Sequence, residues 1–356
     1  MRILRSSLTT DASTPALTRF TSRRPGPVSL IGLGLVALVV VWLAVNLVKT
    51  PSDWVEVLLI GITNGCVYAL VALGYTLVYG ILELINFAHG DVFMLGGMFS
   101  LTLASAFGMH AGQGALWPLV IVVLLISMFC CGIINAAIEL VAYRPLRNAP
   151  RLAPLITAIG VSFIIEDAGL VWKGPNYVTF PDVLPAGNLF SIGSVGVTWT
   201  TPIVVAITLP VLLILLWLVQ KSKQGKAMRA TAQDMEASAI MGINVNRTIS
   251  FTFLIAGALA GAAGLVYALA ETTVRFDQGF QLGLIAFTSA VFGGIGNLPG
   301  AVLGAILIGL IQAFNEGLSW KAPGSDWTES IVFSILILIL VFRPEGLLGE
   351  RTPEGG

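Results

Sequence analysis

The chain has 356 residues, of which 56% are hydrophobic and only 11% are charged, and its 19 basic residues balance its 19 acidic ones. A soluble domain usually carries about 25% charged residues. This composition excludes an ordinary soluble domain and predicts a membrane protein. The zero net charge gives no sign of an acidic or basic partner, and we expect no binding to nucleic acid.

The first 27 residues are polar and include five arginines. The apolar run that follows, at about 28–48, is longer than the roughly 7–15 residues of a signal-peptide core, and it has no clear cleavage site. We therefore expect residues 1–27 to form a flexible cytoplasmic tail and the apolar run to be retained as a transmembrane helix.

Apolar runs of about 20 residues indicate membrane-spanning helices. A ninth apolar region, 281–318, is interrupted by glycine and proline, and it predicts either two short spans or a re-entrant pair of half-helices. We expect an all-α polytopic membrane protein with a transmembrane domain at 28–342. The eight full spans are predicted at about 28–48, 54–80, 88–108, 116–141, 153–172, 200–220, 249–270 and 328–342.

The positions of Lys and Arg predict the orientation, because these residues are enriched in cytoplasmic loops. Fifteen of the 19 basic residues fall on one side of the alternating spans, and four fall on the other. We therefore expect both termini, the C-terminal tail 343–356 and the loop 221–248 to be cytoplasmic. The loop 173–199 is expected outside.

Small residues crowd the span at 249–270, where every residue from 256 to 264 except one is Gly or Ala. Helices in lipid associate through close packing of small residues, so this stripe predicts a helix–helix contact. The cysteines also lie in apolar segments and lack the spacing of a metal site, so we expect them to pack as small hydrophobic residues. They are Cys66, Cys130 and Cys131.

The loop 221–248 holds a polar, helix-forming stretch, which predicts one amphipathic helix over 226–241 that ends at Gly242. A helix that lies on a membrane surface usually has a cationic face and large anchors. This stretch has acidic residues and only small or Met apolar side chains, which favours docking into a groove of a soluble protein. The apolar face consists of Met228, Ala232, Met235 and Ala239, and the polar face of Arg229, Gln233 and Glu236.

Five stretches resemble the branched-chain amino acid permeases of ATP-binding cassette (ABC) importers, in matching order over about residues 54–350. The loop stretch is similar to the Glu-Ala-Ala-x-x-x-Gly signature of ABC importer permeases, with a serine in place of the second alanine. The stretches are Asn64–Gly74, Ile85–Asp91, Glu236-Ala237-Ser238 with Gly242, Phe292–Gly304 and Arg343–Leu347.

The resemblance implies a subunit of an ATP-driven importer in the inner membrane of a bacterium, which carries a branched-chain amino acid or a related small polar solute. The implied partners are ABC ATPase subunits, a second permease that is identical or homologous, and a soluble substrate-binding protein. Two positions of the signature, Glu236 and Gly242, frame the segment that would couple ATP hydrolysis to the membrane gate. The implied coupling residues are Arg229, Gln233, Met235, Glu236, Ala237, Ser238 and Gly242.

The chain lacks the Gly-x-x-x-x-Gly-Lys-Ser/Thr loop that cradles phosphates in P-loop ATPases. We therefore expect a non-catalytic subunit that binds no cofactor or metal, with ATP and Mg²⁺ held by the partner ATPase.

Polar residues at membrane depth are costly and usually face a cavity or one another. One hypothesis is that the segment from Asn86 to Asp91 is broken and lines the substrate path. The alternative is that His89 and Asp91 cap a helix and pair with each other. Interrupted helices in matching halves of a transporter indicate a central site. The candidate path residues are Asn64, Asn86, His89, Gly90, Asp91, Gly293, Gly294, Gly296 and Asn297.

Three further carboxylates lie inside predicted spans. Glu139 is expected to pair with Arg144 or Arg147 near the cytoplasmic end. Glu166 and Asp167 are adjacent in the middle of a span, where ion-coupled transporters place carboxylates. The alternative function is therefore an ion-coupled secondary transporter or channel for a small solute, although that class has no evident use for the helix at 226–242.

Overall fold

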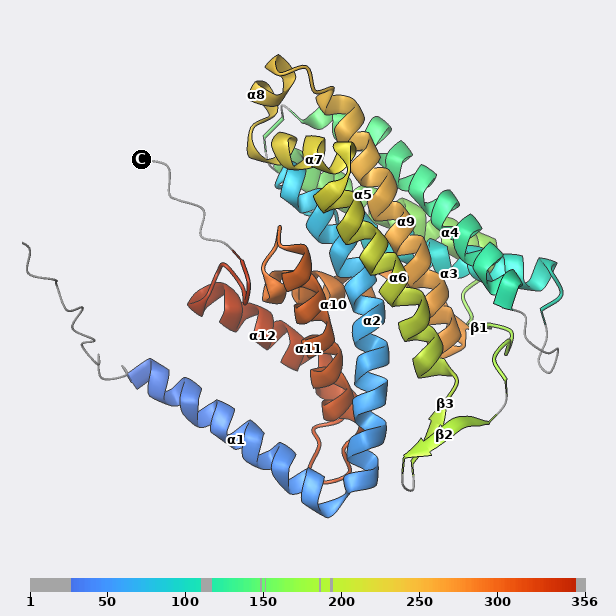
Figure 1. Ribbon diagram of the computed structural model, residues 1–356, viewed down its shortest axis with the longest axis vertical. Coiled ribbons are helices and arrows are strands. Elements are labelled where there is room, and N and C mark those ends of the chain that lie inside the picture. Colours follow the sequence, from blue (N-terminus) through green and yellow to red (C-terminus); the bar gives the residue numbers. More distant parts are fainter. Residues whose placement is uncertain are drawn as a thin grey trace, which may run out of the picture. The chain divides into compact units, whose positions relative to one another are not determined.

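The computed structural model describes residues 27–109, 117–147, 149–150, 152–185, 187–192 and 195–349 (Figure 1). Nearly all of the predicted N-terminal tail and the second half of the predicted C-terminal tail lie outside the described residues. The chain forms two compact units, 1–49 and 50–356. The first unit contains α1 (Pro27–Lys49), which matches the first predicted span.

The second unit is built almost entirely of helices, which confirms the all-α fold. Its predicted spans coincide with α2 (Pro51–Leu82), α3 (Ala88–Ala106), α4 (Trp117–Ile138), α5 (Leu152–Lys173), α6 (Thr200–Lys221), α9 (Val245–Glu271) and α12 (Thr328–Phe342). Short helical turns follow α4 and precede α12, namely a π-helix at Glu139–Tyr143 and 3-10 helices at Arg144–Leu146 and Ser325–Trp327.

The interrupted region 281–318 forms two helices, α10 (Gln278–Gly293) and α11 (Leu298–Gly317). A helix of 16 residues extends about 24 Å at 1.5 Å per residue, so α10 is shorter than the roughly 30 Å hydrocarbon core of a bilayer. Among the described residues, seven helices are long and apolar enough to span a membrane, and α11 is one of them. Of the eight predicted full spans, α3 is not in that set, and α1 contributes only a shorter apolar helix, Ala37–Lys49; α10 is also outside the set.

Four short strands in the described part of the chain are absent from the all-α prediction. In the loop 173–199, β2 (Asn188–Ile192) and β3 (Val195–Thr198) pair as an antiparallel hairpin. β1 (Val178–Thr179) pairs antiparallel with β4 (Thr273–Val274), which directly follows α9. This pairing holds the ends of α5 and α9 at the same end of the unit (Figure 1), as the predicted topology requires.

The two halves of the second unit interlock. α3 and α4 pack mainly against α9, which comes from the second half, and α10 and α11 pack against α2, which comes from the first. Glycines allow this close approach: a Cβ on Gly261 would lie 2.5 Å from the Ser127 carbonyl oxygen, and a Cβ on Gly309 would lie 2.4 Å from the Gly65 nitrogen. The small-residue stripe at 256–264 is thus a helix contact, as predicted.

Candidate functional site

The predicted helix over 226–241 is two helices in the structure, α7 (Lys223–Gln233) and α8 (Met235–Ile240). Asp234 lies between them in an extended conformation, with φ −158° and ψ 112°. Its carboxylate accepts a hydrogen bond from the Ala237 nitrogen at 2.9 Å. Because Asp is a favoured N-cap residue, it ends α7 and starts α8. The prediction of one continuous helix is therefore wrong.

The predicted apolar face changes with this break, since the helical period does not continue across Asp234. Of its four members only Met228 is buried, and Met235 is 37% exposed. Two strongly exposed apolar side chains lie at the end of α8, where Ile240 is 85% and Met241 is 82% exposed. Two adjacent apolar side chains at the tip of a polar loop form a small surface suited to a protein contact.

The other predicted coupling residues surround this tip. Gln233, Glu236 and Ala237 are exposed, whereas Ser238 is buried. Gly242 follows α8 with φ +86°, a left-handed conformation that glycine adopts without a steric cost. The loop is then joined to α9 by Asn244, whose side chain accepts a hydrogen bond from the Arg247 nitrogen at 3.0 Å and so caps that helix.

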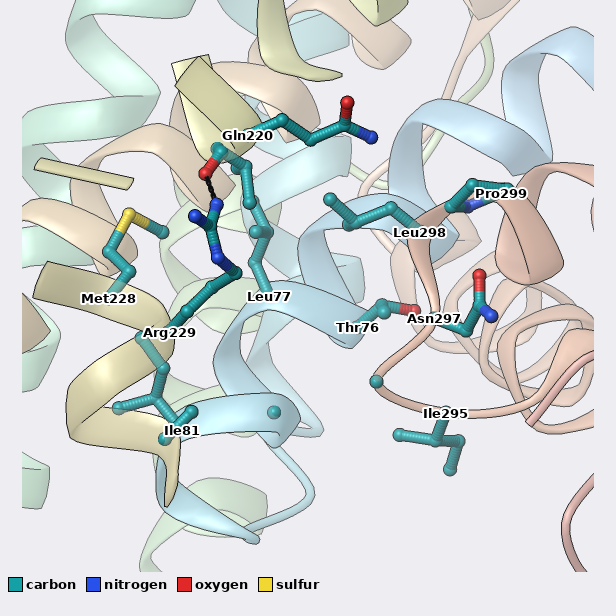
Figure 2. A pocket seen from close by; sticks show the side chains of 14 residues that line it. Thr76, Leu77, Ile81, Gln220, Met228, Arg229, Ile295, Asn297, Leu298 and Pro299 are labelled. Atoms are coloured by element: carbon teal, nitrogen blue, oxygen red, sulfur yellow. Dashed lines mark hydrogen bonds between the residues drawn. The ribbon is translucent and has the colours of Figure 1, made fainter. Parts of the chain in front are cut away.

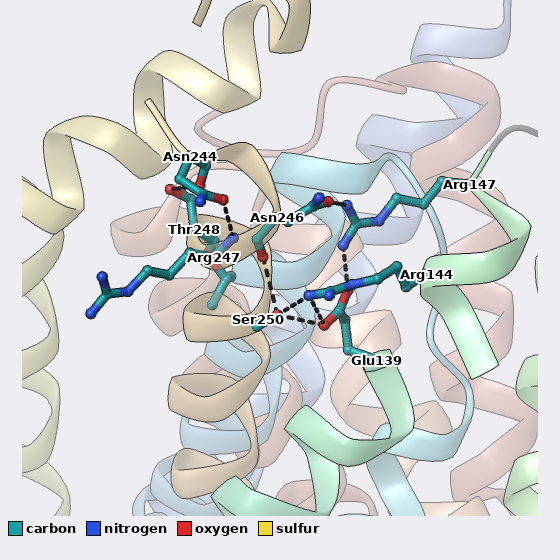
Figure 3. Close-up of polar contacts among 9 residues, drawn as sticks. Glu139, Arg144, Arg147, Asn244, Asn246, Arg247, Thr248 and Ser250 are labelled. Carbon is teal, nitrogen blue, oxygen red and sulfur yellow. Dashed lines mark hydrogen bonds and ion pairs between the residues drawn. The ribbon is translucent and has the colours of Figure 1, made fainter. Parts of the chain in front are cut away.

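Just past this cap, α9 is tied to the end of α4 by a polar cluster around Glu139 (Figure 3). Glu139 is fully buried and pairs with both Arg144 and Arg147, which confirms the expected ion pair. The Arg144 Nε lies 3.3 Å from the Glu139 Oε1. Ser250 of α9 donates a hydrogen bond to the Glu139 Oε2 at 2.6 Å, and Asn246 accepts one from Arg147, also at 2.6 Å.

This cluster satisfies a buried carboxylate with two cations and a hydroxyl, as burial of a charge requires. Partial burial lowers the pKa of the Arg147 guanidinium, and the adjacent Glu139 opposes that shift; an arginine remains charged in either case. The first turn of α9 and the π-helix after α4 are therefore joined by charge-assisted hydrogen bonds. The Asn244 cap at the start of α9 and this cluster thus lie in succession between α8 and the end of α4.

A cavity of about 570 Å³ lies beside α7, and we name it the inner cavity (Figure 2). Its polar lining includes Arg229, Gln220, Thr76 and Asn297. The Arg229 guanidinium donates a hydrogen bond to the Val219 carbonyl oxygen. The rest of the wall is mostly apolar and comes from α2, α6, α7, the turn between α10 and α11, and the start of α11. These residues are Leu77, Gly80, Ile81, Val219, Met228, Ala232, Ile295, Gly296, Leu298 and Pro299.

A second cavity of about 230 Å³, the outer cavity, lies between α2, α9, α10 and α11 near the end that carries β1 and β4. The Tyr68 hydroxyl donates a hydrogen bond to the Gln312 Oε1 at 2.5 Å, and the Gln312 Nε2 donates one to Glu316 at 3.1 Å. Two carboxylates therefore border this cavity, those of Glu316 and Glu271. Its lining is Ile60, Asn64, Val67, Tyr68, Tyr267, Ala270, Glu271, Leu282, Gln312 and Glu316.

α2 forms part of the wall of both cavities. Tyr68 faces the outer cavity and Thr76 the inner one, and the eight helical steps from one to the other span about 12 Å. The intervening residues 69–75 are all buried. The two cavities are thus separated by tightly packed side chains of α2.

The glycine-rich turn between α10 and α11 is completed by the segment near the end of the chain. The Leu347 nitrogen donates to the Phe292 carbonyl oxygen at 2.9 Å, and the Leu348 nitrogen donates to that of Gly293 at 3.0 Å. The Asn297 side chain donates to the Leu348 carbonyl oxygen at 2.7 Å and accepts from the Gly300 nitrogen at 3.0 Å.

Two of the stretches that resemble the permease family, 292–304 and 343–347, therefore pack directly against each other. Gly294 and Gly296 have φ of +109° and +94°, which favours glycine. Asn297 lines the inner cavity, but both ends of its amide serve the backbone. Of the predicted path residues in this turn, Gly296 and Asn297 line a cavity, while Gly293 and Gly294 pack against backbone.

The first-half candidates, Asn86 to Asp91, are buried and line neither cavity. Asn86 accepts a hydrogen bond from the Tyr143 hydroxyl at 2.6 Å, and Gly90 lies tightly against the backbone of α10. Asp91 accepts a hydrogen bond from Ser162 of α5. Neither ring nitrogen of His89 has a hydrogen-bond partner within the described residues, so the predicted pairing of His89 with Asp91 is wrong.

The two adjacent carboxylates of α5 differ in their surroundings. Asp167 is exposed and Glu166 is half-buried, and neither lines the inner or the outer cavity. Only five of the 22 residues of α5 are buried, and neither carboxylate is among them.

The outer cavity was not predicted from the sequence, although Asn64, one of its lining residues, was a candidate path residue. Its carboxylates, Glu271 and Glu316, sit at the ends of α9 and α11, which could have suggested that they share one end of the bundle. The α9 partners of this cluster were also missed, because Ser250 lies 111 positions from Glu139 and Asn246 lies 99 positions from Arg147.

Comparison with known proteins agrees with this architecture. Residues 57–341 match the family model described as the branched-chain amino acid transport system / permease component. The chain is 36% identical over 312 residues to the high-affinity branched-chain amino acid transport system permease protein BraD of Pseudomonas aeruginosa, covering 85% of this chain and 97% of the relative.

It is 35% identical over 299 residues to the corresponding permease protein LivH of Escherichia coli strain K12, covering 83% of this chain and 95% of that protein. A probable branched-chain amino acid transport permease protein of Methanocaldococcus jannaschii is 28% identical over 292 residues, covering 79% of this chain and 88% of its own length. The chain belongs to the branched-chain amino acid transport permease family.

Proposed function

We propose that this multi-pass membrane protein is the translocation subunit of an ATP-driven importer for branched-chain amino acids. The observation that carries the proposal is the exposed tip of α8, which is joined through the Asn244 cap and the Glu139 cluster to the helices of the core. An exposed Ile240–Met241 pair gives a soluble partner an apolar contact. The Glu139 cluster transmits a movement of the α8 tip, caused by that partner, to the transmembrane helices.

In this proposal a separate ATPase, which holds ATP and Mg²⁺, binds at the α8 tip. A second permease copy or homologue completes the membrane part, and a soluble binding protein delivers the solute from outside the inner membrane of the cell. The chain performs no chemistry. Alternating access requires two states of the bundle that differ in which cavity is open, and the packed stretch of α2 between the cavities is the barrier.

The test is uptake of labelled leucine into proteoliposomes that contain the chain with its ATPase and second membrane subunit. With ATP enclosed and loaded binding protein outside, we expect uptake to persist when ionophores abolish the proton and sodium gradients. Uptake that requires a gradient and continues without ATP would instead establish the ion-coupled alternative and overturn the proposal.

A further inference from the structure

We propose that the inner cavity is a binding site for a small aliphatic carboxylate, namely the imported amino acid, with its carboxylate on Arg229 and Thr76 and its side chain on the apolar wall. The inference rests on the proposed function only for the identity of the solute. It also assigns Arg229 a second role, solute binding, in addition to its predicted role in the coupling segment.

The first observation is the hydroxyl of Thr76. This side chain is only 2% exposed, it lines the cavity, and its Oγ1 has no hydrogen-bond partner within the described residues. Threonine in a helix can bond back to the carbonyl one turn earlier, as Thr63 does with Leu59 on the same helix. A buried polar atom without a partner is costly, and a ligand oxygen in the cavity would satisfy it.

The second observation is the charge of the lining. Among the described residues, Arg229 is the only ionisable side chain in the lining, and no described carboxylate lies within ion-pair distance of its guanidinium. A guanidinium carries five N–H donors, and the Val219 carbonyl accepts from one of its nitrogens. Arg229 can therefore still bind a planar carboxylate, for which its donor geometry is suited. Figure 2 shows it on one side of the cavity, with Thr76 and Asn297 across from it.

The third observation is the rest of the wall. Leu77, Ile81, Met228, Ile295 and Leu298 offer an aliphatic surface next to the polar groups. The volume of about 570 Å³ lies within the roughly 300–1,000 Å³ of small-molecule sites. Anionic lipid headgroups are recognised by clusters of several Lys and Arg, and a single arginine beside a buried hydroxyl favours a small solute instead.

Because α7 supplies part of this wall, solute that stays in the cavity contacts the segment next to the α8 tip. A movement of α7 would therefore also move Arg229 and release the carboxylate of the solute. The two cavities differ in charge. The carboxylates of Glu271 and Glu316 border the outer cavity, and the guanidinium of Arg229 borders the inner one, so a carboxylate is attracted to the inner cavity.

The experiment measures binding to the purified full-length protein in phosphatidylcholine nanodiscs, without ATP, ATPase or binding protein. Saturation-transfer NMR with L-leucine, 4-methylpentanoate and L-leucinamide separates the groups of the solute. We expect the two carboxylates to bind and leucinamide, which lacks the carboxylate, to bind at least tenfold more weakly. Equal binding of all three, or none, would overturn the proposal.

Variants locate the site. R229Q should weaken leucine binding at least tenfold, whereas K226Q, which removes a charge from the same helix away from the cavity, should leave it unchanged. T76V, which removes only the hydroxyl, should weaken binding about fivefold, the effect of one neutral hydrogen bond. If R229Q fails to fold, T76V and R229K decide: unchanged affinity in both would refute the site.

The same titration in discs that contain phosphatidylglycerol distinguishes a solute from a lipid headgroup. Unchanged leucine affinity supports the solute, and loss of affinity would show that the lipid phosphate occupies Arg229, which overturns the proposal. Failure here is separate from failure of the proposed function, because an ATP-driven importer could still take up leucine without retaining it at this cavity.

Discussion

Individual buried polar residues in this bundle act mainly as ties between helices. Asp91 on α3 and Ser162 on α5 illustrate this, because the serine hydroxyl is the hydrogen-bond donor to a fully buried carboxyl group. Only five residues of α5 are buried, and this bond joins one of them to α3. The sequence showed that Asp91 was at membrane depth, but its partner is 71 positions away and could not be deduced from spacing.

Ser162→Ala should therefore lower the thermal unfolding midpoint of the purified protein in detergent, because it leaves a buried carboxyl group with one bond fewer, at a cost of about 1–3 kcal/mol. Thr157→Ala is the matched control, since the Thr157 hydroxyl bonds only within α5, to the Ala153 carbonyl oxygen at 2.9 Å. Equal midpoints for the two variants would show that the Asp91–Ser162 bond does not anchor the helix.

Glu139 is a second buried residue that joins helices through its hydrogen-bond and ion-pair partners. Glu139→Gln keeps the shape of the side chain but removes the charge that faces Arg144 and Arg147. Both arginines are partly exposed, so the loss should be moderate, about 1–3 kcal/mol, and visible as a lower unfolding midpoint.

The same variant should transport fewer solute molecules per ATP hydrolysed in proteoliposomes, because the link from α9 to α4 is weakened. Ser250→Ala, which removes one neutral hydrogen-bond partner of the carboxylate, is expected to give a smaller change in the same direction. A variant that unfolds more easily but keeps the full ratio would assign the cluster a structural role only.

At the scale of elements, the helices were predictable because their lengths are set by the bilayer and their apolar runs are continuous. The segment 226–241 was harder, since its composition suits a helix throughout. One residue, Asp234, decides the outcome by capping α8 from an extended conformation. An Asp directly before the first residues of a helix is a capping signal, so the sequence contained the information needed to predict this break.

The turn after α8 provides a test of the coupling segment. Gly242 has φ +86°, and a Cβ placed there would meet no atom within 4 Å. Gly242→Val should therefore act through backbone strain alone, of about 1–2 kcal/mol, because a β-branched residue rarely adopts this conformation. We expect normal insertion and ATPase activity with reduced leucine uptake.

Gly242→Asn is the matched control, because asparagine tolerates the left-handed region. It should retain most of the uptake. If both variants transported normally, the geometry of this turn would not matter for coupling, and if both failed, side-chain bulk at the partner interface would explain the loss better than backbone strain.

At the scale of the whole molecule, the packing of α3 and α4 on α9, and of α10 and α11 on α2, makes each half depend on the other. The tetrapeptide Val-Tyr-Ala-Leu occurs in both α2 and α9, at 67–70 and 266–269, and these are the two most buried of the seven candidate spans among the described residues. Hydropathy predicts that spans exist but not which spans touch, so this interlocking arrangement could not be derived from the sequence.

A chain interrupted within the loop at 181–187 tests the arrangement. The two fragments should co-purify when they are expressed together, because the interruption leaves the helix contacts intact. Each fragment alone should be degraded or aggregate, since α2 or α9 would expose the face that normally packs against the other half. Recovery of either fragment as a folded monomer would contradict an interlocked core.

The backbone bonds of Leu347 and Leu348 to the end of α10 have a consequence for biosynthesis. Translation proceeds from the N-terminus, so the glycine turn at 293–300 reaches its final form only after the ribosome has added residues about fifty positions later. A premature stop just before Arg343 would leave every span in place and yet deprive that turn of its closing strand-like contact. Such a nonsense allele should yield protein in the membrane that is misassembled at the inner cavity.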